Sequence, residues 1–213
     1  MEENSKYVIT IGREIGSGGK AIGILLGKQL GIPVYDRSLI QMAAEESGIS
    51  PKVFKKVDEV PHKGTFSNLV RTLSSPFASY GNLYRNSMSQ ESLFKFQSDV
   101  IREKAESEDC IIIGRCSEYI LRDHPRHLSI FIRANYNDRL KFLMDRNDIS
   151  SDMAKELIEQ TDAVRSDYHN FYSENNWGDS RSYDICINSS LLGIEGTADF
   201  LLTLAKKHLH LPQ

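Results

Sequence analysis

The sequence predicts an α/β protein with one parallel β-sheet flanked by helices. Five short apolar runs, rich in β-branched residues and without clean alternation, cover residues 7–11, 32–35, 110–113, 128–132 and 183–187. Continuous runs of this kind are typical of strands that are buried on both faces. Each run precedes a glycine or turn signal and then a helical pattern, and strand–helix alternation builds a parallel, right-handed layered sheet.

The helices are expected in the intervals between the strands. In chain order the amphipathic stretches cover residues 20–30, 38–47, 90–106, 135–146, 150–172 and 194–208. Apolar residues recur in them at helical spacing, which predicts that one face of each helix is buried. Residues 58–88 interrupt this alternation, because they are rich in Ser, Asn and Gly yet keep several large apolar side chains. This segment is expected to be a loosely packed helical insertion, a type of element that often acts as a lid.

Length and charge limit the class of protein. The 213 residues are 40% hydrophobic, which suits one compact domain spanning residues 1–213. The net charge of −3 argues against a nucleic-acid polymer or an anionic membrane as the partner, since both favour a basic surplus. No apolar stretch approaches the roughly 18 residues of a membrane span, and residues 1–6 lack the order of a secretory signal. Cys110, Cys116 and Cys186 are expected to be reduced core thiols of a cytoplasmic protein.

The glycine-rich turn after the first strand is the most informative segment. It reads Gly16-Ser17-Gly18-Gly19-Lys20 and separates a predicted strand from a predicted helix. Glycines let consecutive backbone N–H groups converge on an anion, and the helix N-terminus adds partial positive charge. A lysine in the first helical turn can reach the outer phosphates as a point charge. The order strand, glycine-rich turn, lysine and helix is the context of a phosphate-binding loop.

Two positions depart from the usual phosphate-loop pattern, G-x-x-x-x-G-K-[ST]. Glu14 stands at the first glycine position, and Ala21 replaces the Ser or Thr whose hydroxyl usually contacts Mg²⁺. A Mg²⁺ ion would then depend on Ser17, on Glu14 or on a carboxylate at another strand end. A glycine-rich turn without a ligand is the alternative interpretation.

Charged residues follow two other predicted strands. Asp36 and Arg37 come after the run 32–35, and Arg115 comes after the run 110–113. Ligands bind at the carboxyl ends of the strands in open α/β sheets, and the planar guanidinium group matches phosphate oxygens. These residues are predicted to bind a phosphorylated acceptor, although Asp36 is also compatible with a Mg²⁺ role or a surface ion pair.

Charged residues on the later helical stretches suggest a lid. Asp162 and Arg165 lie three positions apart and therefore share one helix face, as in a salt bridge or a binding site. Arg139 and Arg146 are seven apart and also lie nearly on one face. Helices that carry arginines near a phosphate loop suit a lid, here residues 139–176, that closes over a triphosphate and excludes water.

Together these residues resemble the nucleoside monophosphate kinases of the P-loop superfamily, and most closely the bacterial cytidylate kinase-like family. The resemblance covers nearly the whole chain and is carried by residues 11–20, 31–36, 57–59, 113–115, 177–178 and 183–190, and by the set Asp162, Arg165 and Tyr168. It implies a three-layer α/β fold with a five-stranded parallel sheet, an acceptor-binding helical insertion at 58–88 and a lid. The implied reaction transfers the γ-phosphoryl group of ATP, with Mg²⁺, to a nucleoside monophosphate such as CMP or dCMP.

The resemblance also implies roles for particular residues. The ATP phosphates would be held by the loop and the start of its helix: Gly16, Ser17, Gly18, Gly19, Lys20 and Ala21. Arg115 resembles the arginine that grips the acceptor phosphate, and Asp162 and Arg165 resemble the pair that contacts the acceptor from the lid side. Asp36 and Arg37 would lie near the entrance of the acceptor site. Lys20, Arg115 and Arg165 are the expected catalytic residues.

Departures from the family pattern keep two other functions open. Phe142 and Leu143 stand where the lid helix usually carries an arginine pair, which leaves Lys141, Arg139 and Arg146 as substitutes. One alternative is a P-loop kinase for another small acceptor, such as a sugar or a shikimate-like alcohol. The other is a nucleotide-binding module that does not transfer phosphate. The expected partners are nucleotide substrates, and the protein is expected to be a monomer or a homodimer.

Overall fold

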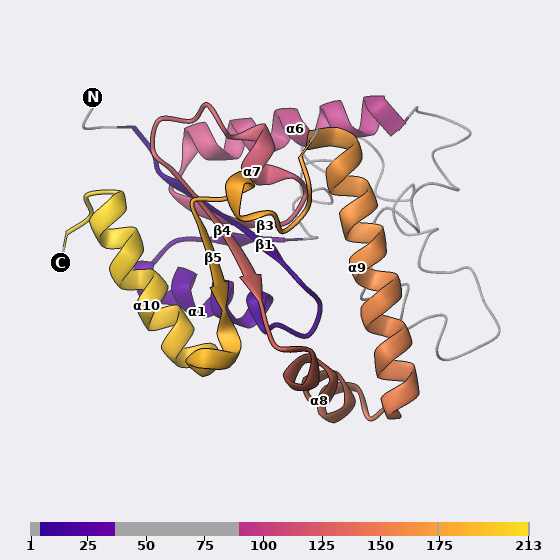
Figure 1. Cartoon of the computed structure of the whole chain (residues 1–213). Helices are drawn as coiled ribbons and strands as arrows, with labels where there is room; N and C mark the ends of the chain where they lie inside the picture. Colours follow the sequence, from indigo (N-terminus) through magenta and orange to yellow (C-terminus); the bar gives the residue numbers. More distant parts are fainter. Residues whose placement is uncertain (1–4, 37–89, 174, 213) are drawn as a thin grey trace.

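A five-stranded parallel β-sheet forms the centre of the protein (Figure 1). The computed structural model describes residues 5–36, 90–173 and 175–212. The strand order is β2-β3-β1-β4-β5. The strands are β1 (Val8–Arg13), β2 (Val34–Tyr35), β3 (Cys110–Ile113), β4 (His127–Arg133) and β5 (Ile185–Asn188). The predicted α/β class with a five-stranded parallel sheet is therefore confirmed.

The strand register brings the ends of β1 and β3 together. Ile11 of β1 is paired with Ile113 of β3 and with Ile130 of β4, all in parallel orientation. Because parallel strands end at the same edge of a sheet, the turns that follow β1 and β3 are neighbours there. This edge is where the phosphate loop and Arg115 were both predicted to lie.

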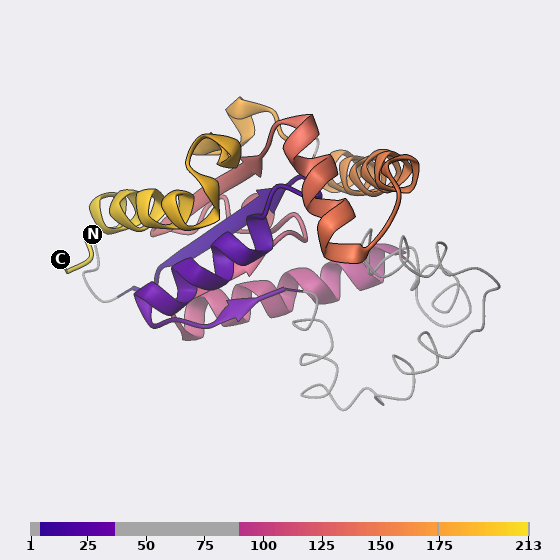
Figure 2. The ribbon, with the colours of Figure 1, turned by 90° about the horizontal axis from the view of Figure 1, so that it is seen from below.

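Helices cover both faces of the sheet (Figure 2). One face carries α1 (Gly19–Leu30) and α10 (Gly193–His208), which pack against each other. The other face carries α6 (Gln90–Ser107), the short α7 (Ser117–Ile120) and part of α9 (Ser151–Ser173). Helix α8 (Tyr136–Asn147) packs on α9, and two 3₁₀ turns, Ser180–Ser182 and Ser189–Leu191, flank β5. The protein is thus a three-layer α/β structure.

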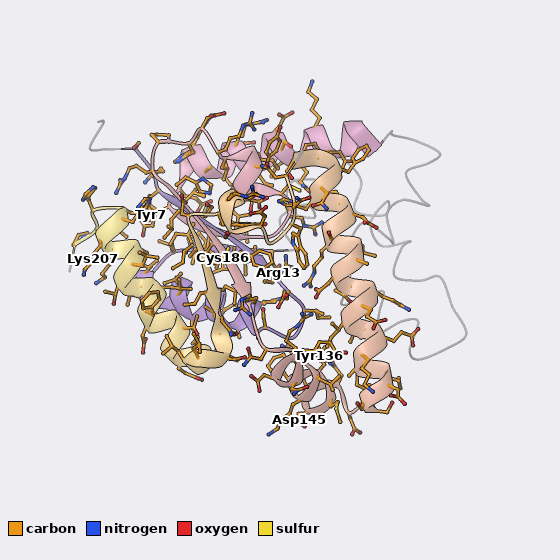
Figure 3. The ribbon with its side chains drawn as sticks, in the orientation of Figure 1. Tyr7, Arg13, Tyr136, Asp145, Cys186 and Lys207 are labelled. Atoms are coloured by element: carbon orange, nitrogen blue, oxygen red, sulfur yellow. The ribbon has the colours of Figure 1, made fainter. Side chains whose placement is uncertain are left out.

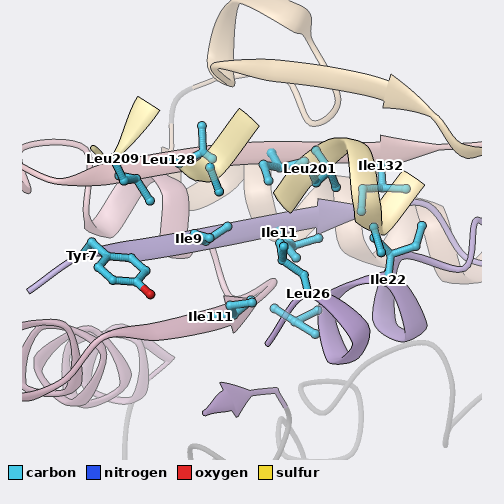
Figure 4. Close-up of a cluster of buried hydrophobic side chains, with 14 residues drawn as sticks. Tyr7, Ile9, Ile11, Ile22, Leu26, Ile111, Leu128, Ile132, Leu201 and Leu209 are labelled. Carbon is cyan, nitrogen blue, oxygen red and sulfur yellow. The ribbon is translucent and has the colours of Figure 1, made fainter. Parts of the chain in front are cut away.

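Alternate residues of β1 face opposite helix layers. Ile9 and Ile11 are fully buried on the side of α1 and α10, where they meet Ile22 and Leu201 (Figure 4). Val8 is buried in the cluster on the side of α6. Full burial of an isoleucine side chain stabilises a fold by roughly 1.5–3 kcal/mol. These buried side chains therefore fix the position of the carboxyl edge of the sheet.

The observed elements match the predicted strands and most predicted helices within a few residues. Helix α7 was not predicted, because four residues are too few for a helical period to show. The predicted helix 38–47 and the insertion 58–88 lie outside the described residues. The core location predicted for Cys186 is wrong, since this residue is exposed on the edge strand β5, whereas Cys110 and Cys116 are buried as expected. Among the helices of the described segments, none has the length and apolarity needed to cross a membrane.

Candidate functional site

A cavity of about 400 Å³ opens at the carboxyl edge of the sheet. Its walls come from the turn after β1, the end of β3, and helices α8 and α9. The predicted site residues on its walls are Gly16, Gly18, Gly19, Lys20, Ala21, Asp36, Arg115, Arg146 and Arg165. Ser17, Arg139 and Asp162 lie behind the walls, and Arg37 lies outside the described residues. One cavity thus joins the predicted phosphate loop to three of the predicted acceptor residues, Asp36, Arg115 and Arg165.

The phosphate loop depends on glycines in left-handed backbone conformation. Gly16 has φ of +77° and Gly18 has φ of +74°, and Gly18 caps the N-terminus of α1. A Cβ atom at Gly16 would lie 2.9 Å from the backbone oxygen of Arg139, so only glycine fits this approach to α8. The loop therefore presents its backbone and the positive end of α1 to the cavity.

Ser17 closes the phosphate loop on itself. Its hydroxyl donates a hydrogen bond to the backbone oxygen of Glu14 at 2.9 Å and accepts one from the N–H of Gly19 at 3.3 Å. The hydroxyl of Ser189 donates to the backbone oxygen of Ser17 at 2.7 Å. Since Ser17 is 3% exposed, its hydroxyl shapes the loop and faces away from the cavity.

Charged side chains tie the loop to the two helices behind it. The N–H of Ile15 donates to Oδ1 of Asp162 at 2.9 Å, and Nε of Arg139 donates to the backbone oxygen of Ile15 at 2.7 Å. The guanidinium of Arg139 also binds the carboxylates of Glu14, at 3.2 Å, and Asp162. A backbone N–H of Ala134, just after β4, donates to Glu14 at 3.1 Å. In this arrangement, the glutamate that replaces the usual glycine anchors the loop to β4 and α8.

Lys20 and Asp36 form an ion pair at the mouth of the cavity. Their N–O distance is 2.5 Å, and the side chain of Lys20 is 58% exposed. An exposed ion pair contributes at most about 1 kcal/mol, because water screens it. Lys20 can therefore leave Asp36 for a phosphate at little cost. Among the carboxylates that line the cavity, Asp36 follows a strand and lies nearest to Lys20.

The turn after β3 has a strained backbone. Gly114, Arg115 and Cys116 have consecutive positive φ values of 76°, 71° and 53°. Residues other than glycine adopt this conformation at a cost of order 1–3 kcal/mol each, and such residues cluster at functional sites. Gln97 of α6 donates a hydrogen bond to the backbone oxygen of Arg115 at 3.1 Å and holds the turn. The strained turn brings Arg115, 9% exposed, to the cavity wall.

Arg165 connects α9 to the end of β1. Its Nη1 donates a hydrogen bond to the backbone oxygen of Arg13 at 3.1 Å and lies 3.9 Å from Oδ1 of Asp162. Burial lowers the pKa of the Arg165 guanidinium, and the positive charge of Arg13 lowers that pKa further. Two cationic groups are therefore held close together beside the cavity.

Sequence reasoning missed three charged residues of this wall. Arg13 ends β1 and lies between the sheet and α9 (Figure 3). The rule that selected Arg37 and Arg115, an arginine at a strand end, would have found it. Glu118 and His169 are buried together, with Nε2 of His169 2.8 Å from a carboxylate oxygen of Glu118. Burial opposes the protonation of His169, but Glu118 outweighs this effect and raises the pKa of His169. No sequence spacing predicts that pair.

Residues 8–191 match the cytidylate kinase-like family. A protein named cytidylate kinase, from Methanobrevibacter smithii, is 27% identical over 204 residues, which cover 93% of this chain and 98% of that protein.

Two solved structures share the arrangement of the chain. An uncharacterized protein from Eubacterium ventriosum superposes with a TM-score of 0.67 at 27% identity, covering 94% of this chain and 99% of that one. Shikimate kinase from Bacteroides thetaiotaomicron superposes with a TM-score of 0.53 at 14% identity, covering 94% of this chain and 98% of that one. The second likeness concerns the fold alone, and this fold is that of the P-loop kinases.

Proposed function

The chain belongs to the cytidylate kinase-like family, and we propose that it transfers the γ-phosphoryl group of ATP to a nucleoside monophosphate, with CMP and dCMP as the first candidates. Family and fold support a phosphotransferase for a nucleotide or another small molecule. The named relative, a cytidylate kinase, supports the narrower choice of acceptor.

The cavity carries this proposal, because it combines a phosphate loop with a surplus of cations. Five side chains of Lys or Arg line it: Arg13, Lys20, Arg115, Arg146 and Arg165. Three carboxylates, those of Glu14, Asp36 and Glu118, line it as well. Phosphoryl transfer needs mainly positioning and neutralisation of phosphate oxygens, which such a surplus supplies. An acceptor that is itself a phosphate suits two arginines opposite the loop better than a neutral alcohol does.

The phosphate loop would hold the donor. Backbone N–H groups between Gly16 and Ala21 and the ammonium of Lys20 are proposed to bind the β- and γ-phosphates of ATP. Ser17 would contribute through its backbone, since its hydroxyl is used within the loop. This role follows from the left-handed glycines and from the exposed position of Lys20.

Residues across the cavity would hold the acceptor. Arg115 and Arg165 are proposed to grip the acceptor phosphate, with Asp36 and Arg37 at the entrance. Asp162 is proposed to contribute on this side through Arg165, 3.9 Å away, in addition to holding the phosphate loop through the N–H of Ile15. Arg146 on α8 lines the cavity and would follow the lid, whereas Arg139 would fix the base of the lid through its buried ion pairs.

The proposed reaction conserves charge and protons. An oxygen of the acceptor phosphate forms a bond to the γ-phosphorus of ATP. The bond from that phosphorus to the β–γ bridging oxygen breaks, and its electron pair leaves with ADP. No strong general base is needed, because the attacking oxygen is already an anion. Lys20, Arg115 and Arg165 would neutralise the charge that develops on the transferred group.

Mg²⁺ fits this site through substrate phosphates and Asp36. Within the described segments, no group of three or more His, Cys, Asp or Glu side chains is arranged to hold a metal ion. Mg²⁺ is commonly bound through one or two carboxylates, phosphate oxygens and waters, so a protein cage is not required. When bound, the ion would neutralise phosphate charge and orient the triphosphate.

We also expect a cytoplasmic location.

Two measurements test the proposal. ADP formation is followed with Mg-ATP and a panel of CMP, dCMP, UMP, AMP, GMP and small alcohols, and the proposal expects an acceptor-dependent rate with a nucleoside monophosphate. Lys20→Ala should slow this reaction, because it removes roughly 2–4 kcal/mol of transition-state stabilisation. Lys28→Ala, on the exposed last turn of α1, is the matched control and should be unaffected.

The outcomes separate the alternatives. A rate only with an alcohol would favour a kinase for another metabolite. Tight ATP binding without transfer to any acceptor would favour a nucleotide-binding module. An unchanged rate in Lys20→Ala would overturn the role of the loop.

A further inference from the structure

Arg13 is held at the junction between the donor loop and the strand end of the acceptor side. Two glycines show this position. A Cβ atom at Gly19 of the loop would lie 2.7 Å from Cβ of Arg13, and one at Gly114, after β3, would lie 2.1 Å from its Nη1. The stem of Arg13 therefore packs on the loop, and its guanidinium lies over the turn that carries Arg115. With the donor at the loop and the acceptor at Arg115, as proposed above, a side chain that touches both elements would lie between the two substrates.

The guanidinium of Arg13 has no committed partner in the described part of the chain. No hydrogen bond or ion pair among residues 5–36, 90–173 and 175–212 involves it, although the side chain is half-buried and lines the cavity. A guanidinium carries five N–H donors, which are costly to leave unsatisfied away from water. Such a group is suited to an anion that enters the cavity.

Neutralisation of nearby carboxylates does not explain Arg13. Its pKa is lowered by burial and raised by Asp36, Asp162 and Glu118. Each of these carboxylates already has another basic side chain within ion-pair distance: Asp36 has Lys20, Asp162 has Arg139, and Glu118 has His169. Arg13 therefore adds positive charge beyond what the carboxylates need.

The neighbouring cation strengthens this argument. Arg165 donates a hydrogen bond to the backbone oxygen of Arg13, and the charge of Arg13 lowers the pKa of Arg165. Like charges at short range in a poorly solvated site repel each other. An anion between the two guanidinium groups would turn this repulsion into attraction to a common ligand.

We propose that Arg13 is a catalytic residue whose guanidinium contacts the phosphoryl group while it passes from ATP to the acceptor. The proposal rests on the proposed function and adds a third arginine to Arg115 and Arg165. During transfer, the bond from the γ-phosphorus to ADP breaks as the bond to the acceptor oxygen forms, and negative charge lies on the equatorial oxygens. The fork of Arg13 is placed to donate to these oxygens from the side of the sheet.

The test compares kcat and KM in Arg13→Met, which keeps the stem that packs on Gly19. The expected result is a loss in kcat of about 100-fold or more, with the KM for ATP and for the acceptor changed less than about threefold, because the contact is made mainly in the transition state. Arg13→Lys should recover part of kcat, since it restores the charge without the fork. Arg102→Met, on the exposed face of α6, is the control and should match the wild type.

The outcomes distinguish this inference from the proposed function. If the wild type transfers no phosphate to any nucleoside monophosphate, the proposed function fails. If the wild type is active and Arg13→Met keeps its kcat, or raises only a KM, the inference is overturned while the function stands. Thermal unfolding is measured in parallel, and Arg13→Met should melt at or above the wild-type temperature. A loss of about 10 °C in both Arg13→Met and Arg13→Lys would assign Arg13 a structural role instead.

Discussion

Nη1 of Arg165 donates a hydrogen bond to the backbone oxygen of Arg13 across 3.1 Å. The two residues are 152 positions apart, one on α9 and the other at the end of β1. This bond fixes the helix that closes the cavity to the strand that leads into the phosphate loop. The strand end is itself held on both sides by β3 and β4, so the bond ties the position of α9 to the base of the phosphate loop.

Asp162 should affect the donor more than the acceptor. Its carboxylate accepts a hydrogen bond from the N–H of Ile15 and binds Arg139, so it supports the phosphate loop directly. Asp162→Ala is expected to raise the KM for ATP by about tenfold, the equivalent of one charged hydrogen bond. The KM for the acceptor should change less. Asp152→Ala, an exposed aspartate on the same helix, serves as the control. A larger effect on the KM for the acceptor would mean that Asp162 acts mainly through Arg165, as the family resemblance implies.

Gly114 should be required for activity because of Arg13. Gly114→Ala introduces a Cβ atom 2.1 Å from Nη1 of Arg13 at a φ of +76°. Gly31→Ala introduces the same backbone strain at a φ of +71° with no atom within 4 Å. Both variants should lose about 1 kcal/mol of unfolding free energy. Only Gly114→Ala should also lose most of its kcat, as measured in the ADP assay. Equal kcat values in the two variants would argue against the displacement of Arg13.

Arg139 should matter for stability, in contrast to Arg146. Arg139 is 7% exposed and pairs with Glu14 and Asp162, so its removal leaves two poorly solvated carboxylates. Arg139→Met is expected to lower the unfolding free energy in urea by about 3–5 kcal/mol. Arg146 is exposed, and Arg146→Met should stay within about 0.5 kcal/mol of the wild type. If both variants lose only a small amount of unfolding free energy, the arginines of α8 do not support the loop.

His127 should make the protein sensitive to acid. Burial lowers its pKa to about 4, and its Nε2 lies 2.8 Å from the hydroxyl of Thr10. Between about pH 6.5 and pH 4, the unfolded chain binds a proton at His127 that the folded chain does not bind. The unfolding free energy should therefore decrease as the pH is lowered through this window, and His127 should account for up to roughly 3 kcal/mol of the decrease.

His127→Gln removes this contribution, so its stability relative to the wild type should improve as the pH falls from 7 to 4. Other titrating groups, including His169, are common to both proteins and cancel in the comparison. His210→Gln, at the exposed C-terminal end, should show no such change. If the difference in unfolding free energy between His127→Gln and the wild type is the same at every pH, His127 is not the group that causes the acid sensitivity.

The strands and the position of the loop follow from local sequence. Apolar runs of four to five residues identified all five strands, and the glycine-rich turn predicted the cavity edge, because both depend on residues that are adjacent in the chain. The predicted roles of Arg37 and of the insertion 58–88 stay predictions.

The support of the loop could not be predicted from the sequence. Glu14, Arg139 and Asp162 come from three elements, and only the folded chain brings their charges within 4 Å. The pairing of Glu118 with His169 has the same origin. Arg13 was missed for a different reason, since it lies within residues 11–20, which were interpreted together as one phosphate-loop segment, and it was not considered as a strand-end arginine.

The fate of the γ-phosphate of ATP shows whether the protein phosphorylates a nucleoside monophosphate. ATP labelled in its γ-phosphate is incubated with the protein, Mg²⁺ and CMP, and the labelled products are separated. We expect the label to move to CDP, with one ADP formed for each CDP. Label found only in inorganic phosphate, or retained in ATP with CMP and every other nucleoside monophosphate, would contradict the proposed function.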